Sequence, residues 1–110
     1  MRVAVAVFGS DVSPRFGCSG KFLVASIEDG QIQDEQIVEA ENMTCSQLPD
    51  FLASLGVSEM ICGGIERPVQ EEIESRGIEV IWGIIGPTAE ALSALVKGTL
   101  RQSQFVRRRD

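Results

Sequence analysis

The side chains of this chain best suited to chemistry are three thiols, at Cys18, Cys45 and Cys62. The chain has no histidine, which removes Ser-His-Asp and Cys-His catalysis and histidine-ligated zinc. The cysteines form no Cys-X-X-Cys pair, and three thiols cannot close a four-ligand zinc site. Thiols do bind soft metals and metal–sulfur clusters. Because the count is odd and the first residues do not resemble a secretory signal, we expect reduced thiols in a cytoplasmic protein.

The charge and composition exclude several classes of partner. Ten basic against sixteen acidic residues give a net charge of −6, which disfavours nucleic acid and anionic membrane surfaces. Hydrophobic residues make up 44% of the chain, yet no apolar run reaches the roughly 18 residues of a membrane span. A chain of 110 residues fits one domain. We expect that domain over residues 1–100 and a flexible tail, with the basic run Arg107 to Arg109, over residues 101–110.

The first half of the chain is patterned as β-structure. Residues 2–8 and 22–28 are apolar runs of strand length. Asp29-Gly30 is a strong signal for a two-residue hairpin, which predicts that residues 31–40 return antiparallel. The polar residues of this third segment suit the edge of a sheet, where charge prevents further pairing.

The second half alternates helices and strands. Apolar residues at helical spacing predict three helices, and short apolar runs predict two strands between them. In order these are a helix through Leu48, Phe51, Leu52 and Leu55, capped by Ser46 and ended by Gly56; a strand over 60–62; a helix through Ile65, Val69 and Ile73, ended by Gly77; a strand over 78–82; and a helix from Gly86-Pro87-Thr88 to Gly98.

This order of elements predicts an α/β fold. Right-handed crossovers make strands 1, 4 and 5 parallel, and the hairpin places strands 2 and 3 on the other side of strand 1. The result is a five-stranded mixed sheet of order 3-2-1-4-5 with three helices, an arrangement like the ribonuclease H fold.

The topology also predicts where the chemistry lies. Residues 9–20, 41–46, 62–64 and 83–87 should share one edge of the sheet, so the three thiols should lie at the same end of the molecule. The helix N-termini point to that edge with partial positive charge, and Arg15, Lys21 and Arg67 add formal positive charge there. An open α/β sheet binds ligands at such an edge. Thiols, glycines and helix starts together favour an anionic, sulfur-rich or metal-bearing ligand.

Several motifs, in this order, resemble the dinitrogenase iron-molybdenum cofactor biosynthesis family over about residues 2–100. They are the opening strand, Val12-Ser13-Pro14-Arg15-Phe16-Gly17, the strand after it, the Asp29-Gly30 hairpin, Glu41-Asn42, Ile61-Cys62-Gly63-Gly64-Ile65, Arg76-Gly77-Ile78 and Val96-Lys97-Gly98-Thr99-Leu100. The resemblance implies a ribonuclease H-like domain that carries iron-molybdenum cofactor or another molybdenum, iron or copper cluster with sulfur, without catalysis. Cluster donor or acceptor proteins would be its partners.

The site expected from the edge and the resemblance has two parts. The contacts to the cluster come from Arg15, Phe16, Gly17, Cys18, Cys45, Gly63 and Gly64, and the metal ligands from Cys18, Cys45 and Cys62. Most of these residues also have a purely structural interpretation: Cys62 as a core side chain, Cys45 as a small residue near a helix start, Arg15 as an exposed loop charge, Phe16-Gly17 as a plug of the core, and Gly63-Gly64 as a sharp turn.

One departure from the family pattern leaves two functions open. Family members usually carry histidine where this chain has Arg15, and a guanidinium cannot ligate a metal. Either thiolates have replaced the family's ligands, or the chain is a regulatory or protein-interaction module that no longer binds a cluster. A nuclease is the weakest alternative, because the carboxylates at this edge, Asp11, Glu41 and Glu66, are not placed within strands.

Overall fold

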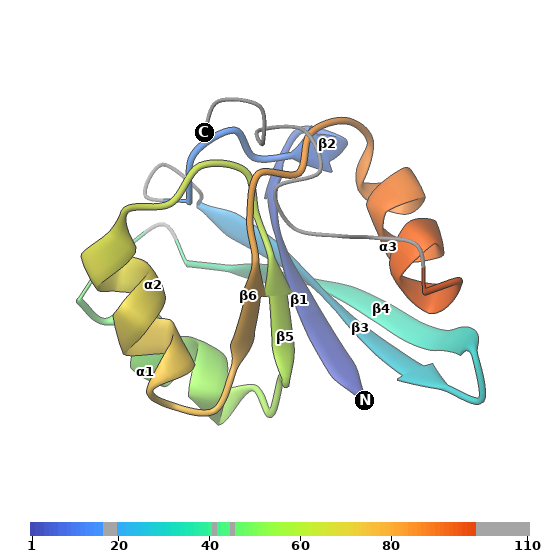
Figure 1. The fold of residues 1–110 in the computed structure, drawn as a ribbon, viewed down its shortest axis with the longest axis horizontal. Coiled ribbons are helices and arrows are strands. Elements are labelled where there is room, and N and C mark those ends of the chain that lie inside the picture. Colours follow the sequence, from blue (N-terminus) through green and yellow to red (C-terminus); the bar gives the residue numbers. More distant parts are fainter. Residues whose placement is uncertain (17–19, 41, 45, 99–110) are drawn as a thin grey trace.

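One mixed β-sheet runs through the centre of the molecule with helices on both faces (Figure 1). The structure is a computed structural model that describes residues 1–16, 20–40, 42–44 and 46–98. The elements are β1 (Arg2–Phe8), β2 (Asp11–Val12), β3 (Lys21–Glu28), β4 (Gln31–Glu39), α1 (Leu48–Ser54), β5 (Glu59–Ile61), α2 (Arg67–Glu74), β6 (Glu79–Ile81) and α3 (Thr88–Val96). Within the described part, no helix is long and apolar enough to cross a membrane.

The strand order confirms the predicted topology. The sheet runs β4-β3-β1-β5-β6, with β1, β5 and β6 parallel and the β3–β4 hairpin antiparallel to its neighbours. The predicted loop after β1 differs in one respect, because it contains the short strand β2, which pairs back on β1 through Val7 and Val12. This sixth strand folds the loop over the carboxyl end of β1.

The two faces of the sheet carry separate cores, and β1 supplies both by strict alternation. Ala4 and Ala6 face α1 and α2, where their small side chains leave room for Phe16 and Phe22. The valines at odd positions of β1 face α3 and pack in the same cluster as Leu92. Figure 1 shows α1 and α2 on one side of the sheet and α3 on the other.

The hairpin forms as predicted. Asp29 has φ 53° and Gly30 has φ 73°, the two left-handed residues that a type I′ turn requires. The register is irregular beyond the turn: Ser26 pairs with Asp34 whereas Ile27 pairs with Ile32, so Gln33 is an extra residue in β4. β4 is exposed along almost its whole length, as expected of a charged edge strand.

The start of α1 corrects one expectation. Gln47, not Ser46, is the N-cap residue, and no side chain caps the helix. The Ser46 hydroxyl instead lies 3.0 Å from the Thr44 hydroxyl, and the Gln47 side chain accepts a hydrogen bond from the Thr44 N–H. The helix therefore begins one residue later than a Ser46 cap requires, because these side chains bond within the preceding turn.

Candidate functional site

Backbone hydrogen bonds join the loop after β1 to the turn after β5. The Gly63 N–H donates to the Ser13 carbonyl at 3.0 Å, and the Gly64 N–H donates to the Pro14 carbonyl at 2.7 Å. The Phe16 N–H donates in return to the Gly64 carbonyl at 2.8 Å. These bonds join residues 13–16 to residues 63–64, and we call the surface that these two segments form the rim.

The loop after β6 joins the rim. The Val12 N–H donates to the Gly86 carbonyl at 2.9 Å, and the Gly83 N–H donates to the Gly63 carbonyl at 2.8 Å. The expected meeting of these three loops at one edge of the sheet is therefore confirmed, and they lie together at the top of Figure 1.

Gly63 is required by the close approach of the two backbones. A Cβ atom at this position would lie 2.5 Å from the Ser13 carbonyl oxygen and 2.9 Å from the Pro14 Cα. A Cβ at Gly64 would lie 3.2 Å from the Pro14 oxygen, so that position is less tight. Since both N–H groups already donate to carbonyls of the loop, this geometry matches the structural interpretation of the glycine pair.

Phe16 and Arg15 are adjacent in sequence but differ in their surroundings. Phe16 is 1% exposed, and its ring centroid lies 5.8 Å from that of Phe22 in the core beneath the rim. Arg15 is exposed, and its carbonyl accepts a hydrogen bond from the buried Ser13 hydroxyl at 2.9 Å. Phe16 therefore anchors the loop in the core, while Arg15 beside it is exposed.

The side chain of Cys62, the residue before Gly63, is buried in the core and does not reach the surface of the rim. It has no exposed surface and belongs to the core cluster that also contains Phe16 and Met60. Burial raises the pKa of the thiol to about 12, so it is protonated at neutral pH. These surroundings match the core interpretation of this residue rather than that of a metal ligand.

The structure brings together Arg15, Phe16, Gly63 and Gly64 among the predicted site residues. Gly17, Cys18 and Cys45 lie outside the described residues, as does Glu41. Lys21 begins β3 at the rim end of β1, Arg67 begins α2, and both are exposed. Within the described ranges, no three histidine, cysteine, aspartate or glutamate residues gather to hold a metal ion.

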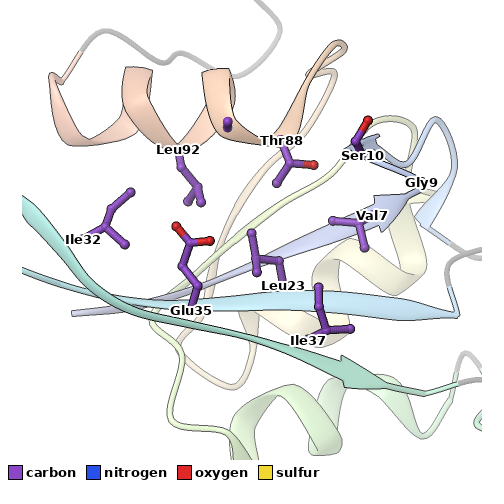
Figure 2. Close-up of a pocket in the computed structure, with 10 residues that line it drawn as sticks. Val7, Gly9, Ser10, Leu23, Ile32, Glu35, Ile37, Thr88 and Leu92 are labelled. Carbon is purple, nitrogen blue, oxygen red and sulfur yellow. The ribbon is translucent and has the colours of Figure 1, made fainter.

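The sequence did not reveal a cavity of about 330 Å³ between the β3–β4 hairpin and α3 (Figure 2). Its lining residues are Val7, Gly9, Ser10, Leu23, Ile32, Glu35, Ile37, Thr88, Ala89 and Leu92. The available signal was the pair of isoleucines in β4, apolar side chains in a strand that otherwise has the composition of an exposed edge.

Comparison with known proteins assigns the chain to a family. The sequence model of the family described as "Dinitrogenase iron-molybdenum cofactor" matches residues 1–98. An uncharacterized protein of Methanocaldococcus jannaschii is 26% identical over 107 residues, which are 93% of this chain and 91% of that protein.

Two solved structures share the fold. The crystal structure of PH0822 has a TM-score of 0.88 and 29% identity, covering 96% of each chain. The NMR structure of a Thermotoga protein with a suggested NifB identity has a TM-score of 0.75 and 28% identity, covering 96% of this chain and 97% of that one. With the family match over nearly its whole length, the chain belongs to the dinitrogenase iron-molybdenum cofactor family.

Proposed function

We propose that this protein binds and carries an iron-molybdenum or related metal–sulfur cluster at the rim, and that it catalyses no reaction on it. The family match supports the class of ligand. The cluster is cargo that the protein receives from one cytoplasmic partner and hands to another.

The observation that carries this proposal is the fixed position of the loop at Arg15. Phe16 anchors the loop in the core, and hydrogen bonds to Gly63 and Gly64 hold its backbone, while Arg15 remains exposed. A guanidinium donates several hydrogen bonds to an anion, and sulfides of a cluster are acceptors. Exposed Arg15, Lys21 and Arg67 add cationic side chains to an edge that also carries the exposed carboxylates of Asp11 and Glu66, in a chain whose net charge is −6.

The proposed metal ligands are the thiolates of Cys18 and Cys45. Cys18 follows Phe16 by two residues, and Cys45 lies in the segment between β4 and α1. Cys62 stays out of this ligand set because its thiol is buried and its pKa is about 12. A protein with two thiolates and an exposed guanidinium can hold a preassembled cluster that supplies its own bridging sulfides.

Anaerobic reconstitution tests the proposal. The purified protein is incubated with iron, molybdate and sulfide, or with copper and tetrathiomolybdate, and is then desalted. We expect retained metal by elemental analysis and a visible absorption band. Cys18→Ser and Cys45→Ser should each lower the metal retained, whereas Cys62→Ala, the matched control, should retain as much as the wild type. Equal retention by all three variants would remove the thiolate ligands from the proposal.

The second candidate function is an interaction module that has kept the fold without the cluster. Two observations favour it: the thiol of Cys62 is buried, and the N–H groups of Gly63 and Gly64 donate to protein carbonyls. It predicts no metal retention from either mixture, together with stable association with another protein in a pull-down with the intact chain.

A further inference from the structure

We propose that the cavity between β4 and α3 binds a small organic amine, a molecule with an apolar body and one protonated amino group. This site goes beyond the proposed cluster site. Of the lining residues that the structure describes, none is a cysteine, arginine or lysine.

The cavity walls are apolar and partly open to solvent. Val7 and Leu92 form the buried side, at 7% and 1% exposure. Ile32 and Ile37 form the open side and remain 38% and 55% exposed. Exposed aliphatic surface of this kind gains free energy when an apolar group covers it. A volume of about 330 Å³ lies at the small end of ligand sites, and suits one aromatic ring or a short alkyl chain.

The irregularity in β4 builds this wall. Because Gln33 is an extra residue in the pairing of β4 with β3, Ile32 lies on the same side of the strand as Glu35 and Ile37. All three side chains rise from β4 toward α3 in Figure 2. Bulges that re-aim side chains are common beside functional sites.

Thr88, a lining residue of the cavity, carries an unpartnered hydroxyl on the side toward Ser10. Its side chain extends from the first turn of α3 toward the sheet, it is only 7% exposed, and its hydroxyl is buried without a hydrogen-bond partner. An unsatisfied buried hydroxyl costs stability, so a ligand that bonds to it recovers that cost. The Thr88 N–H is already used, since it donates to the Ser10 carbonyl at 2.9 Å.

Glu35 sets the charge of the ligand. It is the one charged side chain among the described lining residues, and its carboxylate lies on the side of β4 that faces Leu92 (Figure 2). A carboxylate accepts hydrogen bonds and repels anions, so it selects an ammonium group over a neutral or acidic one. A ligand with its amino group at Glu35 and its apolar body against the isoleucines and Leu92 matches both the charge and the apolar walls of the cavity.

The test compares three ligands of similar shape: phenethylamine, phenethyl alcohol and phenylacetate. Each is titrated into the isotope-labelled full chain at neutral pH, and amide NMR shifts give Kd and location. We expect phenethylamine to shift the amides of Leu23, Ile37 and Ala89 and to bind more tightly than the alcohol. Phenylacetate should bind most weakly.

Two substitutions examine the polar groups. Glu35→Gln should reduce the preference for the amine over the alcohol by about two- to fivefold, whereas Glu39→Gln, on the same exposed strand but outside the cavity, should leave it unchanged. Thr88→Val should weaken amine binding about two- to tenfold without lowering Tm, and Thr88→Ser, which keeps the hydroxyl, should restore binding.

Three results would each overturn the inference. They are equal Kd values for the three ligands, shifts confined to residues outside the cavity, and tighter binding of phenylacetate than of the amine. A negative result here leaves the cluster proposal untouched, because neither experiment uses the other's residues.

Discussion

Ile32 and Ile37 lie on the same face of the sheet although an odd number of positions separates them in β4. In a regular strand, side chains an odd number apart point to opposite faces. The pairing skips Gln33, which reverses the alternation once between the two isoleucines. This single extra residue puts two exposed aliphatic side chains opposite α3.

Deletion of Gln33 is expected to preserve the hairpin. The remaining residues can keep the pairing of Ile27 with Ile32 and of Ala25 with Glu35, because the deletion removes only the unpaired position. Deletion of Gln36, in the regularly paired part of β4, is the control and should shift the register and reverse the facing of the residues beyond it. Cross-strand NOE contacts beyond each deletion measure this: those between residues 25 and 35 should survive deletion of Gln33, and those between residues 23 and 37 should be lost on deletion of Gln36. Loss of the contacts between residues 25 and 35 in the Gln33 deletion would contradict the bulge assignment.

Substitution of Gly63 by alanine should destabilise the protein by about 1–3 kcal/mol, as overpacking does elsewhere. The added Cβ would lie 2.5 Å from the Ser13 carbonyl oxygen, so the two rim segments must separate. Gly64→Ala, whose Cβ would lie 3.2 Å from the nearest atom, is the control and should cost less. Urea unfolding of the two variants gives the comparison, and equal costs would show that the close contact at Gly63 is not limiting.

The thiol of Cys62 should resist alkylation in the native protein. A Cys18→Ser/Cys45→Ser variant leaves Cys62 as its single thiol, so that iodoacetamide reports on this site alone. Its burial and its pKa of about 12 predict slow labelling at pH 8 and rapid labelling after unfolding in urea. Labelling of the folded variant at the rate of a small thiol would place Cys62 at the surface.

Cys62 should also make stability depend on pH in the alkaline range. The pKa is raised in the folded state, so the stabilisation is fully present below the ordinary value of 9.0 and is lost as pH rises toward 12. Between pH 9.0 and about 12, the free energy of unfolding falls by about 1.4 kcal/mol per pH unit, because the unfolded chain releases this proton and the folded chain keeps it. The contribution of Cys62 is the difference between the alkaline Tm profiles of the wild type and of Cys62→Ala. Profiles that fall equally with pH in the two proteins would refute this prediction.

Glu59 is expected to reduce stability at neutral pH. Desolvation raises the pKa of its carboxyl, Glu79 beside it raises that pKa further, and its Oε1 is buried without a hydrogen-bond partner. Because the folded state favours the protonated form, stability from this group is present below pH 4.5 and is lost as pH rises. Glu59→Gln should therefore raise Tm at neutral pH, whereas exposed Glu71→Gln should not; a lower Tm for Glu59→Gln would show a favourable role for the charge.

Local pattern was sufficient for every described element except β2, and for their order. The alternation of Val and Ala in β1, the Asp29-Gly30 turn and the apolar spacing of the helices are all set by neighbouring residues, whose backbone preferences act within a few positions. Right-handed crossovers then left one arrangement of the strands, which is the one observed. The meeting of the loops at one edge followed from that connectivity.

Sequence alone determined the fold and the family, because these depend on periodicity and on ordered motifs. Tertiary structure decided which side chains at the edge where the loops meet are accessible. Cys62 and Gly63 are adjacent, yet the thiol faces a packed core and the glycine accommodates another backbone. It also decided the register of β4 and the unpartnered hydroxyl of Thr88. These properties arise from contacts between segments distant in sequence, and no local pattern encodes the space that such segments leave.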